Sequence, residues 1–398
     1  MPNPYIDFRK KQNICALELR NKEKYYSDLL NIERSWSGRM DASISNTFVM
    51  EAEQLLVNAI ELFEQGYFDS AYYSLRSAVD LSTTMVFLAD MSDDKRENYL
   101  EAWKSTSDFP MQGQMIKALA QEGDIFSDMR KNMPAFFEDA KKLSSELNKF
   151  VHKQGLQHFY VARNNAQNQN RQQDSFINTF ERYLKCCIGV VAVMRLAIDP
   201  FPILLMDEEI LYRCFDSMTE PYTEEFVDEY IGIPTVEQYR QTEIYKGTYD
   251  SIIVEEKKNE AVFNVMKHQY IDANRLEEIF AQLHLLSKDD IISVLLIASN
   301  SKVIKTYHHD GIIMYFTNRS TNRKVMSWSG ADFKKFREND RHLNQPYDEA
   351  YISVFVFDES VYYIEHNEQI TTTEAGEIQR FVVSALDKVG IQTNEHVN

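Results

Sequence analysis

Asn148 and His152 are spaced so that their side chains can act on the same ligand. They are four residues apart, so on a helix they lie on one face, about one turn from each other. An imidazole with an ordinary pKa of about 6.5 can take a proton from a ribose 2′-hydroxyl and return a proton to the leaving oxygen. The pair therefore permits acid–base chemistry on RNA.

His152 also has a structural interpretation. A histidine near the C-terminal end of a helix is favoured by the helix dipole, and Gly155, three residues later, is typical of a helix stop. A structural or dimer-interface role for His152 therefore stays open beside the chemical one.

Positive charge surrounds this pair, although the whole chain carries a net charge of −18. Residues 141–195 contain nine basic and three acidic residues, whereas residues 207–260 contain five basic and fifteen acidic ones. Cations that neutralise phosphates release counterions, so the basic stretch is suited to a nucleic acid or nucleotide, or else forms solvated helix faces. Five cations near His152 are the candidate phosphate-binding residues: Lys141, Lys142, Lys149, Lys153 and Arg163.

The glycines exclude several familiar enzyme classes. Only 12 occur, and the closest pair, Gly113 and Gly123, is ten positions apart. The dinucleotide fingerprint, the P-loop and the nucleophile elbow each need glycines about two to five positions apart. These three phosphate-binding and nucleophilic motifs are therefore absent from the sequence.

The sequence predicts neither a metal site nor a cofactor. His308, His309 and Asp310 precede Gly311 between two expected strands. Adjacent side chains on a strand point to opposite faces, so the two histidines cannot bind one metal ion unless a turn reorients them. A hairpin turn is the favoured interpretation of this segment.

Cysteine usage and the N-terminus predict a cytoplasmic protein with no membrane partner. The four cysteines form no C-x-x-C motif, and the N-terminal MPNPYIDFRKKQN contains no apolar segment. The first pattern indicates a reducing compartment, and the second gives no secretory signal. The charge-free apolar run Cys186–Met194 is too short to span a bilayer.

The elements that position Asn148 and His152 are expected to be helices. Apolar residues recur every three or four positions over 43–65 and 69–90, and Gly66 ends the first of these segments, so an antiparallel helical hairpin is predicted. Two more long helices are expected over 124–152 and 174–198.

The remainder of the chain has a different pattern. From Lys302 onward, short β-branched and aromatic runs separated by turn residues predict an antiparallel sheet, followed by a terminal helix. The predicted fold class is an all-α bundle joined by a helical connector to an α+β domain. Its four parts are an N-terminal helical extension over 1–42, the bundle over 43–202, an acidic connector over 203–300 and the α+β domain over 301–398.

The helical block resembles the higher eukaryotes and prokaryotes nucleotide-binding (HEPN) domain over residues 43–198. Two features carry the resemblance, the Asn148-x-x-x-His152 helix end and a hairpin with seven matching residues: Gly66, Tyr67, Ala71, Tyr72, Leu75, Arg76 and Ala78. The resemblance implies a dimer and a metal-independent ribonuclease site, in which His152 is the general acid/base and Asn148 positions it.

The motif arginine of that family is missing. Active members of the family carry an Arg-x4–6-His motif. The three positions at that spacing before His152 are Ser145, Glu146 and Leu147, and none of them is a cation. Loss of a donor to the scissile phosphate typically costs about 10²–10³ in rate. Arg76 on the helical hairpin either faces solvent or forms an ion pair with Asp80, four residues on, and the ion pair is the favoured interpretation.

The sequence therefore predicts an HEPN-like, non-catalytic protein that binds RNA or a nucleotide and forms a homodimer, in a bacterial stress or phage-defence setting implied only by the resemblance. One alternative is an active metal-independent endoribonuclease in which another cation replaces the arginine. A second is an interaction scaffold whose acidic 207–260 segment docks a basic protein partner.

Overall fold

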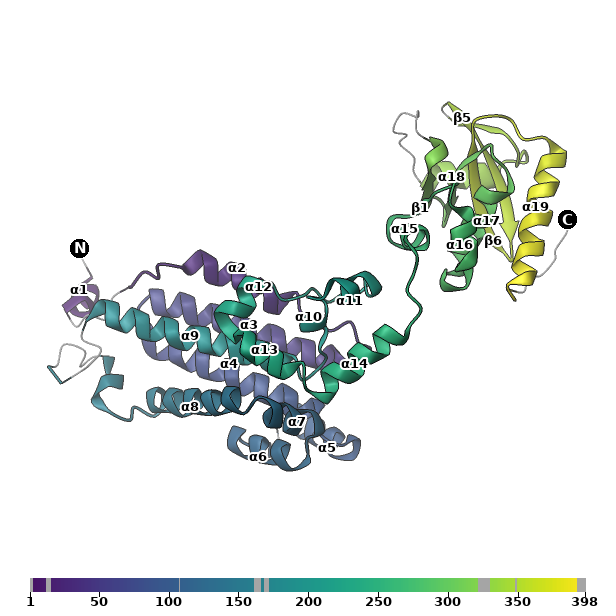
Figure 1. The fold of residues 1–398 in the computed structure, drawn as a ribbon. Coiled ribbons are helices and arrows are strands. Elements are labelled where there is room, and N and C mark those ends of the chain that lie inside the picture. Colours follow the sequence, from purple (N-terminus) through teal and green to yellow (C-terminus); the bar gives the residue numbers. More distant parts are fainter. Residues whose placement is uncertain are drawn as a thin grey trace. The chain divides into compact units, whose positions relative to one another are not determined.

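The computed structural model describes residues 3–11, 16–106, 108–160, 166–167, 172–320, 330–347 and 349–391. The chain divides into two compact units, Met1–Glu255 and Glu256–Asn398. The first is helical and the second contains helices and a sheet (Figure 1). The overall class of helices plus an α+β part is therefore confirmed.

Two long helices form the centre of the first unit. α3 (Ser43–Glu64) and α4 (Phe68–Ala89) repeat apolar residues at helical spacing and bury that face. Gly66, with φ of 82°, makes the left-handed turn between them. The predicted antiparallel hairpin is confirmed (Figure 1).

Two further helices complete the core of this unit. α8 (Pro134–Val151) and α9 (Gln173–Arg195) both pack against α4. Aromatic rings fill the space between them, and the centroids of Tyr72 on α4 and Phe150 on α8 are 3.9 Å apart. α8 is therefore held by its apolar face, which leaves its polar face available for a site.

The prediction of one helix over 124–152 is wrong. The segment forms α7 (Asp124–Asn132) and α8, with a break at Met133, whose backbone has φ of −120° and ψ of 51°. The break follows from Pro134, because a proline disfavours helical geometry in the residue before it and is suited to the first turn of a new helix.

Shorter helices surround this core, and no strand occurs among the described residues of 43–198. The segments expected on either side of the bundle, 1–42 and the first part of 203–300, belong to the same unit. The remaining elements of the unit are α1 (Pro4–Lys11), α2 (Lys22–Glu33), η1 (Met40–Ala42), α5 (Asp93–Lys104), α6 (Gln112–Glu122), η2 (Leu156–His158), α10 (Phe201–Leu204), α11 (Glu208–Arg213), α12 (Glu224–Phe226), η5 (Val227–Ile231), α13 (Ile233–Tyr239) and α14 (Glu243–Val254).

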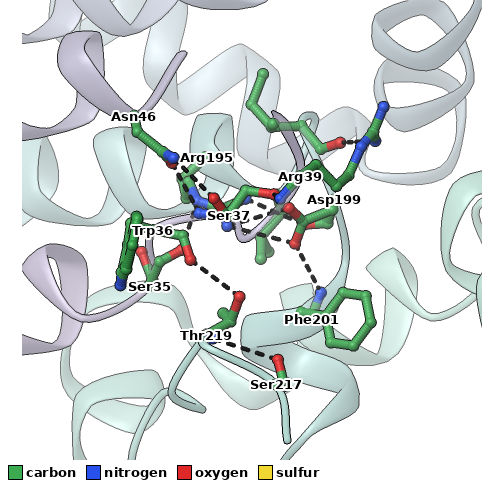
Figure 2. Close-up of polar contacts among 12 residues, drawn as sticks. Ser35, Trp36, Ser37, Arg39, Asn46, Arg195, Asp199, Phe201, Ser217 and Thr219 are labelled. Atoms are coloured by element: carbon green, nitrogen blue, oxygen red, sulfur yellow. Dashed lines mark hydrogen bonds and ion pairs between the residues drawn. The ribbon is translucent and has the colours of Figure 1, made fainter. Parts of the chain in front are cut away.

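A buried ion pair lies at the C-terminal end of α9. The guanidinium of Arg195 has no exposed surface, faces the Asp199 carboxylate at 3.3 Å and donates from Nε to the Ser35 carbonyl at 2.7 Å (Figure 2). The side-chain amide of Asn46 forms two hydrogen bonds with the backbone of Ser37. Its Oδ1 accepts from the Ser37 N–H at 2.7 Å, and its Nδ2 donates to the Ser37 carbonyl at 2.8 Å. Arg195 is therefore a structural residue that fixes the segment between α2 and α3, and it adds nothing to a basic surface.

The second unit is built on a six-stranded sheet with strand order β1-β3-β2-β6-β5-β4. The sequence predicts a purely antiparallel sheet, and this prediction is wrong at one edge. The sheet is mixed, because β1 pairs in parallel with β3. All other neighbours pair antiparallel. The strands are β1 (Tyr270–Ile271), β2 (Val303–His308), β3 (Ile313–Thr317), β4 (Gln345–Tyr347), β5 (Ala350–Phe357) and β6 (Ser360–His366).

Helices cover both faces of this sheet (Figure 1). α17 (Lys288–Ser299) and α19 (Thr372–Lys388) pack together on one face, and α18 (Gly330–Glu338) places Phe333 against the other. α17 therefore belongs to the sheet unit, although its residues were predicted to lie in the connector. The unit also contains α15 (Glu260–His268), α16 (Leu276–Ala281), η6 (Leu283–Leu285) and η7 (Asn318–Ser320).

Candidate functional site

The α8 helix carries most of the residues predicted to form a site. Its buried side chains Leu143, Leu147 and Phe150 face the core. Asn148 lies at the edge of this face, where the Nε atom of Arg76 on α4 donates a 2.8 Å hydrogen bond to Asn148 Oδ1. Only the amide oxygen can accept from a guanidinium, so this contact fixes the orientation of the Asn148 amide.

Arg76 also forms the predicted ion pair with Asp80, which is confirmed. Its side chain is only 14% exposed, and burial lowers the pKa of the guanidinium from its ordinary value. Arginine nevertheless stays charged at neutral pH. The sequence interpretation found the contact with Asp80 but missed the contact with Asn148, because only tertiary packing brings positions 76 and 148 together.

A cavity of about 490 Å³ opens beside Asn148. It lies among α4, α6, α7, α8 and α9, and α8 contributes Lys141, Ser144, Ser145 and Asn148 to its wall. Arg130 on α7 lines it too. Apolar and amide side chains make up much of the rest, among them Phe126, Phe136, Phe137, Val190, Ile116 and Gln112.

His152 lies outside this cavity. It is the exposed C-cap residue of α8, and its backbone N–H donates to the Asn148 carbonyl at 2.9 Å. Within the described chain, no hydrogen bond, ion pair or ring contact involves its imidazole. After it, Lys153 at φ of 52° and Gly155 at φ of 106° end the helix. The geometry of His152 therefore matches its structural interpretation, and no side-chain hydrogen bond joins these two described residues, His152 and Asn148.

The five predicted phosphate-binding cations have different surroundings. Lys141 and Lys142 are exposed and approach Glu138 at 3.8 Å and Asp139 at 3.1 Å. Lys149 is exposed on the same helix. Arg163 lies outside the described residues. Of these cations, Lys141 is the one that lines the cavity.

Lys153 is held by the fold. It forms an ion pair with Asp69, donates to the His158 carbonyl at 3.0 Å and lies 4.8 Å from the centroid of the Tyr160 ring. The His158 imidazole itself is buried, and within the part of the chain that the structure describes neither of its ring nitrogens has a hydrogen-bond partner. Burial, with the charges of Lys153 and Lys149, lowers the pKa of His158 and favours its neutral form.

Much of the positive charge over 141–195 is neutralised inside the unit. Glu146 accepts a 2.8 Å hydrogen bond from the hydroxyl of Tyr183 and pairs with Arg182 at 3.5 Å, so it is turned toward α9. Burial and this hydrogen bond raise the pKa of Tyr183 to about 12. Lys185 pairs with Glu229. The charge count of the sequence therefore overstates the basic surface.

In the second unit, the structure gathers three residues that can hold a metal ion. One ligand atom from each of Asp289, His308 and His309 lies within 4.8 Å of the other two. The prediction of a turn after the histidines is confirmed, but this turn brings both rings to one carboxylate. Sequence reasoning missed Asp289, since its helix was not expected to pack on the sheet.

No family model, curated protein or solved structure matches the chain. Among the described residues, no helix is both long enough and apolar enough to cross a membrane.

Proposed function

We propose that the helical unit binds a nucleoside phosphate, either free or as part of single-stranded RNA, and does not cleave it. The observation that carries this proposal is the cavity of about 490 Å³ beside Asn148. Ligand pockets typically have volumes of about 300–1,000 Å³, so the size suits one nucleotide.

The lining suits the chemistry of such a ligand. Aromatic and aliphatic side chains of α7 and α8 offer an apolar wall for a base. The cations Lys141 and Arg130 line the cavity together with one carboxylate, Glu138, and offer positive charge to a phosphate. The Asn148 amide oxygen is occupied by Arg76, so its two N–H donors remain to face a ligand. Within the described chain, no protein acceptor meets this NH₂ group.

Two features favour binding over cleavage. His152 does not line the cavity, and a general acid/base must reach the proton that it moves. The Arg76 charge is already offset by Asp80. Together these features leave the predicted pair Asn148 and His152 without a shared site for the reacting phosphate.

One observation favours a second candidate, the metal-independent endoribonuclease. Arg76 contacts Asn148 from another helix and is a cation that could replace the missing motif arginine. That activity requires cleavage in the presence of EDTA, with 2′,3′-cyclic phosphate products, because the 2′-hydroxyl would be the nucleophile.

Calorimetric titration tests the proposal, with the four ribonucleoside 5′-monophosphates and a short single-stranded RNA as separate ligands. We expect saturable binding of at least one of them, at one ligand per chain. Binding of RNA should weaken steeply as salt rises from about 50 to 200 mM, because displaced counterions contribute to the affinity. The absence of binding by every ligand at low salt would contradict the proposal.

The proposal retains the homodimer, the stress or defence setting and the cytoplasmic location. The first two are supported by the HEPN resemblance, and the third by the cysteine pattern. The acidic 207–260 segment is a weaker candidate for a partner surface, because Glu209, Glu229 and Glu237 form ion pairs within the chain.

A further inference from the structure

We infer that Asp289, His308 and His309 form a binding site for one divalent transition-metal ion in the second unit. The ligand atoms are Oδ2 of Asp289, Nδ1 of His308 and Nε2 of His309. This site is separate from the cavity of the first unit and does not depend on its function.

The distances between the donor atoms match a metal centre. Asp289 Oδ2 lies 3.6 Å from His308 Nδ1 and 3.4 Å from His309 Nε2. Zn²⁺ binds nitrogen and oxygen at about 2.0–2.2 Å, so two ligands at a tetrahedral angle lie roughly 3.4 Å apart. The two pairs that include Asp289 therefore already have the spacing of ligands on one ion, and the two histidine nitrogens lie within 4.8 Å of each other.

The backbone brings the two adjacent histidines to the same side. β2 ends at His308, and the next residues, His309 at φ of 49° and Asp310 at φ of 50°, are left-handed. Gly311 completes the turn at φ of 85°, and a Cβ there would meet the Phe333 ring at 2.3 Å. The turn thus overrides the alternation of a strand, which would have separated the two rings.

The carboxylate is positioned by two elements. Asp289 lies in the first turn of α17, where the helix dipole favours an anion. The Tyr362 hydroxyl on β6 donates to Asp289 Oδ1 at 2.5 Å, which leaves Oδ2 directed to the histidines. Outer hydrogen bonds of this kind are typical of ligating carboxylates.

His308 gives an independent indication of a ligand. Its side chain is only 3% exposed, yet among the described residues neither ring nitrogen has a hydrogen-bond partner, and Nδ1 faces only the Asp289 carboxylate at 3.6 Å. A buried polar group without a partner is costly and calls for an explanation. Coordination of a metal ion through Nδ1 would satisfy one of the two nitrogens.

The donor set and the surrounding space define the kind of ion. Two imidazoles and one carboxylate suit Zn²⁺, Co²⁺, Ni²⁺ or Fe²⁺ better than Mg²⁺ or Ca²⁺, which prefer oxygen ligands. The three residues line a cavity of about 280 Å³, and Arg337 and Ser360 are among the other residues that line it. Three protein ligands leave a fourth coordination position open to this cavity, as in metal sites that bind an exogenous group.

Titration of EDTA-treated, dialysed protein with Zn²⁺ tests this site, and Co²⁺ provides a visible absorption spectrum that reports histidine coordination. We expect one ion per chain at this site. His309→Ala should weaken binding by at least about tenfold and alter the Co²⁺ spectrum, because His309 is a ligand. This histidine is 60% exposed, so its loss is compatible with folding.

Two further variants keep the result interpretable. Asp289→Asn retains an acceptor for Tyr362 but removes the charge, and it should also weaken Zn²⁺ binding by at least about tenfold. His284→Ala is the matched control, since His284 is another 60% exposed histidine of the same unit and faces Glu256 at 2.9 Å. Circular dichroism confirms that each variant is folded. Equal affinity of wild type, His309→Ala and Asp289→Asn, or no Zn²⁺ binding by wild type, would overturn the inference.

Discussion

Arg76 and Asn148 are joined by a 2.8 Å hydrogen bond from Nε to Oδ1, which connects α4 to α8. The same guanidinium pairs with Asp80 on its own helix. Because the Arg76 side chain is only 14% exposed, its guanidinium depends on these two partners to compensate for lost hydration. The bond to Asn148 fixes one wall residue of the cavity, and the ion pair with Asp80 offsets the charge that a ribonuclease site would need.

Removal of Arg76 should therefore destabilise the fold. Arg76→Met leaves Asp80 and Asn148 without their partner, and we expect the free energy of unfolding to fall by about 1–3 kcal/mol. Urea titration at neutral pH measures this change. Lys149→Met, at an exposed position of α8, should change it by less than about 0.5 kcal/mol. Equal small effects of both substitutions would show that the Arg76 contacts contribute nothing.

Loss of the buried Arg195–Asp199 pair should have a larger effect. Asp199→Ala leaves the Arg195 charge buried without its counterion, and the free energy of unfolding should fall by about 3–5 kcal/mol. The control is Asp174→Ala, which removes the exposed pair with Arg20 and should cost less than about 1 kcal/mol. Thermal and urea unfolding of the two variants measure the difference, and similar losses would contradict the structural role of the buried pair.

The raised pKa of Glu53 should make the stability of the fold depend on pH. It is partly buried on α3, and burial together with the charge of Glu33 raises its pKa to about 7 from an ordinary value of 4.5. Between these values the folded state binds more protons than the unfolded state, so the free energy of unfolding falls as pH rises and stays lowered above pH 7.

Glu53→Gln removes this ionisation. It should raise the free energy of unfolding by about 2 kcal/mol near pH 8 and change it little near pH 4. Urea titrations at the two pH values measure the effect, with Glu51→Gln as the exposed control on the same helix. A stabilisation that is the same at both pH values would show that ionisation of Glu53 is not its cause.

His152 distinguishes a binder from an enzyme. As an exposed C-cap residue outside the cavity, it should be replaceable by alanine with less than about a twofold change in ligand affinity. Wild type should show no cleavage of single-stranded RNA in EDTA above that of a mock preparation. Cleavage by wild type that is lost by about 10²–10⁴ in His152→Ala would establish acid–base catalysis instead.

The spacing of residues along the sequence predicts where the helices lie more accurately than it predicts which helices contact each other. Gly66 and the apolar spacing around it are sufficient to indicate the α3–α4 hairpin, and the i,i+4 spacing of Arg76 and Asp80 indicates their ion pair. The break before α8 could also have been found, because Pro134 stands in the sequence.

The contacts that build the candidate sites depend on tertiary packing. The Arg76–Asn148 bond joins residues 72 positions apart, and Asp289 reaches the histidines only because α17 packs on the sheet. The left-handed backbone of His309, in the turn after β2, is uncommon for any residue other than glycine, so the residue type alone does not indicate it. Charge counting failed at Arg195 for a related reason, since a count does not distinguish buried from exposed cations.

The most direct test of the central claim compares charge reversal at two neighbouring lysines of α8. Lys141 lines the cavity, whereas Lys142 is outside it; both are exposed and both approach an acidic residue three positions earlier. Affinity for the ligand identified by calorimetry should fall by at least about tenfold in Lys141→Glu and by much less in Lys142→Glu, because only the former opposes a phosphate in the cavity. Equal losses in the two variants, or no loss in Lys141→Glu, would contradict the assignment of the cavity as the ligand site.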